Sequence, residues 1–190
     1  MSEASTINKV LIANINKYAG VPIGSIAKVN GVDVSPAPVE YTEEQTEYST
    51  WLIIGAAHPT RAGQKLTIPN RQVTKLAFYT LRYGGPSGDV TFLIRKASDD
   101  SPIASKMWGN ANTLPTDLTW VEVAFDEPVT INDEVRILLQ FEGGSGSIGV
   151  AGSHYLGSVK DNELWTQSLN GGYTDKADQE GCYRYKYYEV

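Results

Sequence analysis

The cleanest alternation of apolar and polar residues in this chain is Glu134-Val135-Arg136-Ile137-Leu138-Leu139-Gln140-Phe141. Successive side chains of a β-strand point to opposite faces, so the alternation predicts a strand with one buried face. The residues expected to face inward are Val135, Ile137, Leu139 and Phe141. Those expected to face outward are Glu134, Arg136 and Gln140.

The chain around this segment also reads as β-structure. Further strand candidates are Thr50–Ile54, Lys65–Ile68, Val73–Arg82, Val90–Arg95, Trp120–Phe125 and Cys182–Tyr188. Tyr83–Asp89 and Gly143–Ser147 are rich in turn residues. No segment after residue 50 shows a helical period over ten residues. The pattern predicts an all-β fold, an antiparallel β-sandwich that is jelly-roll-like, with an immunoglobulin-like sandwich as the second choice.

The N-terminal segment contains a repeat with a register of eleven residues. Ile12, Ile15, Lys17, Gly20 and Val21 recur as Ile23, Ile26, Lys28, Gly31 and Val32. So short a repeat cannot bury its apolar residues alone, and repeats gain stability by stacking on neighbours. We therefore expect an extended N-terminal arm for attachment or assembly. Its candidate contact residues are Ile12, Ile15, Gly20, Ile23, Ile26, Val29, Gly31 and Val32.

Composition divides the chain into three parts. Residues 1–35 form the repeat arm, and Ser35-Pro36-Ala37-Pro38 begins a polar, acidic stretch that is interpreted as a linker over residues 36–48. Residues 49–190 form the predicted sandwich.

The overall charge narrows the classes of partner. The net charge is −6 and no basic stretch exists, which disfavours a nucleic-acid partner.

No apolar run is long enough to predict a membrane span, and Met1–Ser5 lacks the features of a signal peptide. Synthesis and retention in a cytoplasm, or release from it by lysis, is expected. The single cysteine, Cys182, excludes an intrachain disulfide and is interpreted as a buried thiol.

Two parts of the chain resemble known families. The block Gln64–Phe141 resembles a β-sandwich module found in bacterial surface proteins and in phage virion proteins, and Leu164–Tyr188 looks like its closing strands. The matching motifs are Gln64–Pro69, Val73–Tyr79, Gly85–Val90, Ile94-Arg95, Trp120–Phe125 and Pro128-Val129. The module is described as jelly-roll-like and carbohydrate-binding-module-like. Lys28-Val29-Asn30-Gly31-Val32 resembles repeats at the N-termini of phage structural proteins.

Together the two resemblances imply a bacteriophage virion structural protein: a head fibre, a capsid decoration or a tail component. They imply other virion proteins as partners, a homo-oligomer with a trimer favoured, and synthesis in the host cytoplasm. The alternative function is a carbohydrate-binding module or adhesin domain that recognises surface glycans.

No motif for catalysis is present. His58 and His154 lie in no metal-ligand or triad pattern, and a nucleophile motif is missing. The acidic pairs Asp99-Asp100, Asp126-Glu127 and Asp133-Glu134 fall at predicted turns, where solvated carboxylates are usual and a structural calcium ion is the alternative. We expect no enzymatic activity and no cofactor.

Aromatic side chains are the remaining candidates for ligand binding. Trp108, Trp120 and Trp165 could stack on sugar rings, and Trp120 is expected to point outward. The other interpretation is that these tryptophans fill the sandwich core or a subunit interface. Tyr183, Tyr185 and Tyr187 share one face and are expected in the core.

Overall fold

The computed structural model describes residues 38–55, 58–154, 160–169 and 171–190, without the side chains of residues 143, 153 and 154. It also describes the backbone of residues 17–18, 21–22, 28–29 and 32–33. The chain forms two units, Met1–Val39 and Glu40–Val190.

In the first unit, each copy of the repeat contributes one small β-hairpin. Strand β1 (Lys17–Tyr18) pairs with β2 (Val21–Pro22), and β3 (Lys28–Val29) pairs with β4 (Val32–Asp33). The registers are equivalent, because Tyr18 faces Val21 just as Val29 faces Val32. Each copy of the repeat within the predicted arm therefore contains a short antiparallel pair of strands. In the sequence, Ala19-Gly20 and Asn30-Gly31 stand between the strands of the two pairs, and two residues that include glycine are typical of a hairpin connection.

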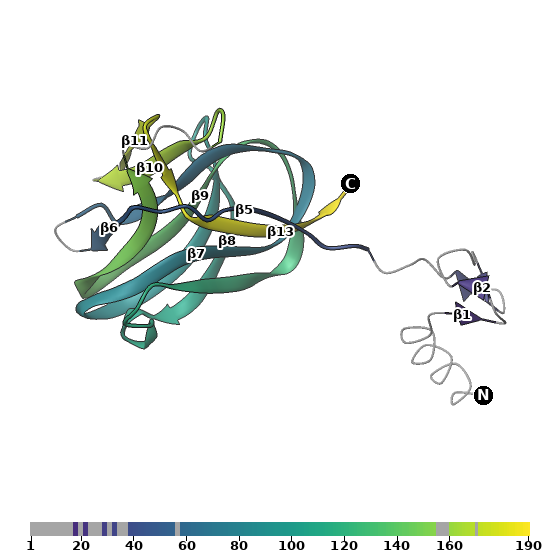
Figure 1. Ribbon diagram of the computed structural model, residues 1–190, viewed down its shortest axis with the longest axis horizontal. Coiled ribbons are helices and arrows are strands. Elements are labelled where there is room, and N and C mark those ends of the chain that lie inside the picture. Colours follow the sequence, from purple (N-terminus) through teal and green to yellow (C-terminus); the bar gives the residue numbers. More distant parts are fainter. Residues whose placement is uncertain are drawn as a thin grey trace. The chain divides into compact units, whose positions relative to one another are not determined.

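The second unit is all-β and antiparallel, which confirms the predicted sandwich (Figure 1). Its strands are β5 (Tyr41–Gln45), β6 (Thr50–Gly55), β7 (Arg61–Lys96), β8 (Pro102–Asn110), β9 (Thr119–His154), β10 (Leu164–Leu169), β11 (Gly172–Lys176), β12 (Gln179–Gly181) and β13 (Tyr183–Glu189), with a short 3₁₀ helix, η2 (Ala111–Thr113), after β8.

The long strands β7 and β9 bend and thereby take part in both layers of the sandwich. The register of β7 shifts near Asn70, which has a φ of 44°, and again after Tyr83, where Gly84 and Gly85 have φ values of 69° and 71°. In one layer, residues 61–68 and 89–96 of β7 flank residues 133–142 of β9, with β10–β11 on one side and β8 on the other. In the other layer, residues 71–83 of β7 pair with β13 and β9, and β5 and β6 follow outside them.

The core lies between these layers. The rings of Phe78 and Phe92, one from each layer, have centroids 5.7 Å apart. The inward-facing residues of the segment quoted at the outset are all buried, as predicted: Val135, Ile137, Leu139 and Phe141. The predicted core tyrosines are buried too: Tyr183, Tyr185 and Tyr187.

The outward face of this segment is buried at Arg136, which the alternation alone does not predict. Arg136 is only 8% exposed, because Thr166, Asp175 and the carbonyl of Ala97 accept hydrogen bonds from its guanidinium group. Leu138, next to it on the same face, is fully buried. The outer face of this layer is therefore covered locally by polar side chains and by the turn after β7.

The predicted linker also differs from the structure. Residues 41–45 form the edge strand β5, which pairs with β13. Acidic residues are uncommon in strands, but here Glu44 pairs with Arg184 at 2.6 Å and the ring of Tyr41 stacks on Tyr187 at 5.7 Å. The cationic and aromatic residues of β13 thus convert an apparently solvated stretch into part of the sandwich.

Candidate functional site

The second layer carries a continuous set of apolar side chains on its outward face. We call this set the outer aromatic face; its residues are Tyr48, Trp51, Tyr79, Leu81, Tyr83 and Trp120. Tyr79, Leu81 and Tyr83 lie at alternate positions of β7 and so share one face. None of the six is in the buried core, and Tyr48 and Tyr83 are 49% and 50% exposed.

One half of this face is centred on Tyr79. Its ring lies 5.3 Å from that of Tyr48 and 5.4 Å from that of Trp120, its cross-strand partner on β9. The guanidinium of Arg184 packs over the indole of Trp120 at 4.5 Å, while its Nε donates to Glu44. Trp120 thus points outward as predicted, but a guanidinium and a tyrosine ring already contact its indole.

The other half is centred on Trp51, which comes from β6. A Cβ built on Gly149 of β9 would lie 2.7 Å from Cε3 of Trp51 and 3.3 Å from Cγ of Leu81. The indole therefore lies across the sheet at a position where only glycine leaves room for it. The ring of Tyr83 completes this half, with its centroid 5.3 Å from that of Trp51.

The three predicted glycan-stacking tryptophans are not brought together. Trp165 is 3% exposed and belongs to the core, so its proposed role as a stacking platform is wrong. Trp108, on the edge strand β8, is partly buried and packs against the core. The alternative interpretation, that these tryptophans fill the sandwich core, therefore holds for Trp165. Trp108 is only partly buried in the core.

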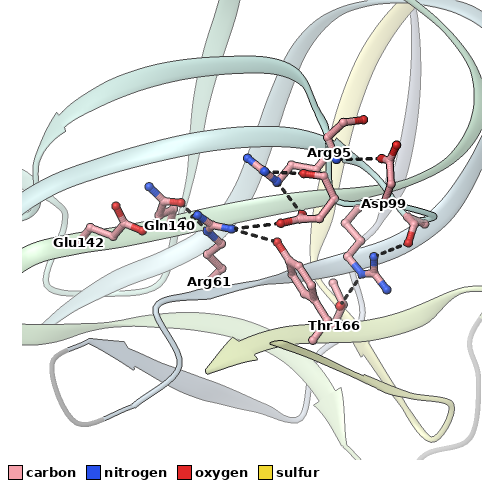
Figure 2. Close-up of polar contacts among 11 residues, drawn as sticks. Arg61, Arg95, Asp99, Gln140, Glu142 and Thr166 are labelled. Carbon is pink, nitrogen blue, oxygen red and sulfur yellow. Dashed lines mark hydrogen bonds and ion pairs between the residues drawn. The ribbon is translucent and has the colours of Figure 1, made fainter. Parts of the chain in front are cut away.

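A network of charges covers the outer face of the first layer, shown in Figure 2. Arg61 donates to Gln140 and to the hydroxyl of Tyr173, and it pairs with Asp100 at 3.7 Å and Glu142 at 3.6 Å. In the same network, Arg95 pairs with Asp100 at 2.6 Å, and Arg136 pairs with Asp175 at 2.9 Å.

Every cation in this network faces at least one carboxylate, so the network offers no uncompensated charge for an anionic ligand. Hydrogen bonds from Arg136 and Thr166, together with the charge of Lys65, hold the pKa of Asp175 below its usual value despite partial burial. We infer that these ion pairs and hydrogen bonds stabilise the packing of the turn after β7 and of β10 and β11 against the sheet.

A second polar cluster lies near the start of β13. The hydroxyl of Tyr183 donates to both carboxylate oxygens of Glu163 at 2.8 Å, and Lys160 contacts Glu43 and Tyr183. Burial raises the pKa of Glu163, although the Tyr183 hydrogen bond opposes this shift. Gln64, which is fully buried, accepts a hydrogen bond from the backbone N–H of Gly181.

The acidic pairs considered for calcium or catalysis are held apart by separate partners. Asp100 pairs with Arg95, Asp126 with Lys106, and Glu134 with Lys65. Within the described part of the chain, no group of three or more potential metal ligands is present. His58 is exposed in the loop after β6.

Cys182 is buried, as predicted. Its thiol contacts the carbonyl of Glu47 at 3.1 Å, and burial raises its pKa to about 12.

Ile12, Ile15, Gly20, Ile23, Ile26 and Gly31 lie outside the described residues, while Val29 and Val32 form a cross-strand pair. The half of the outer aromatic face around Trp51 was not predicted. The sequence pattern that could have predicted this half is the alternation of Tyr79, Leu81 and Tyr83. The turn predicted from the sequence begins at Tyr83, so the alternation was not extended to it.

Over the residues that the structure describes, no helix is long and apolar enough to span a bilayer.

Comparison with known proteins gives only distant likenesses. No protein-family model and no curated protein matches the chain. Among solved structures, the isomalto-dextranase of Arthrobacter globiformis T6 aligns with 62% of this chain and 24% of its own length, at 14% identity and a TM-score of 0.33. VP2 of infectious bursal disease virus, in a subviral particle, aligns with 93% of this chain and 46% of its own length, at 15% identity and a TM-score of 0.34. The chain thus spans less than half of either protein, and at these TM-scores the likeness assigns neither a fold nor a function.

Proposed function

We propose that this chain is a non-enzymatic bacteriophage virion structural protein that attaches through its N-terminal arm and displays the sandwich. The observation that carries the proposal is the repetition of one hairpin, in one register, eleven residues apart. The resemblance of the arm and the sandwich to phage structural proteins, read from the sequence, supports the virion assignment.

The size of the hairpins supports a role in assembly. Each has strands of two residues, and an isolated two-stranded hairpin is marginally stable at best in water. The free edge of a hairpin leaves backbone N–H and C=O groups that another chain can pair with. Because both copies have the same register, a partner surface that fits one hairpin has the geometry to fit the other.

The finer assignment within the virion follows the same reasoning. We propose a capsid decoration, a head fibre or a tail component, held by other virion proteins and assembled as a homo-oligomer, with a trimer favoured. Nucleic acid and membrane are not among the proposed partners. Synthesis in the host cytoplasm is part of the proposal.

The proposal assigns no catalytic role. Asp100, Asp126 and Glu134 pair with separate cations, which supports structural roles for these carboxylates. Glycan recognition by Trp108, Trp120 and Trp165 acting together has no geometric support.

The test is whether the chain is a particle component. Virus particles from the source culture would be purified on a density gradient and analysed by quantitative mass spectrometry. We expect the chain at a fixed ratio to the major capsid protein across the particle fractions. Its absence from particles, with all of it in the soluble fractions, would show that the virion assignment is wrong.

A further inference from the structure

We propose that the outer aromatic face binds a neutral glycan, whose sugar ring stacks on Trp51 beside Tyr83. All residues of this site belong to the second unit, and the proposal does not depend on the attachment proposal. It also differs from the trio of tryptophans that the sequence suggested, because it uses neither Trp108 nor Trp165.

The first argument is that this part of the sheet is apolar where an outward face is normally polar. Antiparallel sheets usually bury one face and expose a polar one. Here the outward positions of β6, of the end of β9 and of the neighbouring part of β7 carry no charged residue. These residues are Trp51, Ile53, Ser147, Gly149, Ala151, Tyr79, Leu81 and Tyr83. Tyr83 is half exposed, and Trp51, Ile53, Tyr79 and Leu81 are partly exposed. Apolar side chains gathered in this way on an outward face favour an interaction site.

The second argument is the way the indole of Trp51 lies. Gly149 lets it rest across the sheet, and Leu81 supports it. A ring held against the sheet presents a shallow surface. Protein interfaces, in contrast, concentrate their energy in aromatic anchors that enter pockets. A shallow aromatic surface suits the flat, apolar C–H face of a pyranose ring.

The third argument is the distribution of polar groups and charge. Tyr83 is about half exposed and brings a hydroxyl group, which can donate or accept a hydrogen bond, to the margin of the patch. The arm holds three lysines and two acidic residues of a chain with net charge −6, which leaves −7 on residues 40–190. An acidic domain with an uncharged aromatic patch favours a neutral glycan over one that carries uronic acids.

The proposal is tested by affinity electrophoresis of the full chain. Native gels would contain hydroxyethylcellulose, xyloglucan, galactomannan, dextran or, as the anionic comparison, polygalacturonate. We expect at least one neutral polymer to retard the chain and polygalacturonate to leave its mobility unchanged. Trp51→Ala and Tyr83→Ala should each weaken the retarding interaction about tenfold or more.

Two further variants separate loss of the site from loss of the fold. Gly149→Ala places a methyl group against the indole and should reduce binding, with the far-UV circular dichroism spectrum unchanged. Met107→Ala removes an apolar side chain that is 62% exposed on β8 and should bind like the wild type. Retardation should also survive deletion of residues 1–39, so that failure of the arm proposal and failure of this one are distinguishable.

Three results would overturn the proposal. The first is that none of the neutral polymers retards the chain. The second is retardation that Trp51→Ala and Gly149→Ala leave unchanged. The third is a concentration-dependent increase in mass that Trp51→Ala abolishes, which would identify the patch as a contact between copies of the chain.

Discussion

Replacing Arg136 tests whether the charge network of Figure 2 stabilises the sandwich. Its guanidinium donates to Thr166 at 3.2 Å, to the carbonyl of Ala97 at 2.8 Å and to Asp175 at 2.9 Å, and it packs 4.4 Å from the ring centroid of Tyr173. Arg136→Met keeps most of the side-chain volume but removes every donor.

The expected cost follows from burial. Breaking a buried ion pair by removing one partner costs about 3–5 kcal/mol, and exposed pairs contribute about 0–1 kcal/mol. The side chain of Arg136 is 10% exposed and that of Asp175 is 24% exposed, so the pair is neither fully buried nor free in solvent. We therefore expect Arg136→Met to lower the free energy of unfolding by about 2–3 kcal/mol, with about 1 kcal/mol of coupling to Asp175→Asn.

The assay is urea unfolding of the four members of the double-mutant cycle, followed by intrinsic fluorescence at pH 7 and at lower pH. Asp175 has a lowered pKa in the folded state, so its contribution is complete above the unfolded-state pKa. That contribution is lost as the pH falls through the folded-state pKa, and Arg136→Met should reduce this acid-dependent loss. A cost below about 0.5 kcal/mol, or coupling near zero, would refute the reasoning, because such values are typical of solvent-exposed pairs.

Three further perturbations test other parts of the structure. Phe78→Ala should lower the free energy of unfolding by about 3–5 kcal/mol in urea titrations, since its ring packs on the opposite layer, and Met107→Ala should change it by less than about 0.5 kcal/mol. Burial raises the pKa of the Cys182 thiol to about 12, so the thiol should react with a thiol reagent at pH 8 only after denaturant is added. Fast reaction of the native chain would contradict the burial of this thiol. Burial raises the folded-state pKa of Glu163, so ionisation of this carboxyl opposes folding as the pH rises between its unfolded-state and folded-state pKa values. Glu163→Gln should therefore flatten the dependence of the free energy of unfolding on pH in that range. An unchanged dependence would count against the raised pKa.

The sandwich was predictable because its strands carry strong local patterns. The alternation at Val135–Phe141 and at Tyr183–Tyr187 depends only on one face being buried, and the structure confirms both. Strand β5 was not predictable in the same way, because Glu43 and Glu44 become suitable for a strand only beside Arg71, Lys160 and Arg184, which lie far away in the sequence.

The candidate site was only partly predictable, for a related reason. Outward orientation of Trp120 follows from the alternation of its own strand. Trp165 is buried by neighbours that the local sequence does not reveal. The position of Trp51 depends on Gly149, nearly a hundred residues away, and a glycine in a strand does not disclose which ring lies over it.

The central claim, that the repeat arm drives assembly, is tested most directly by the mass of the chain in solution. Multi-angle light scattering after size exclusion would compare the full chain with residues 40–190 at equal concentrations, with circular dichroism as the control for folding. We predict a defined oligomer for the full chain and a monomer for the shorter one. Equal masses for the two would contradict an assembly role for the arm.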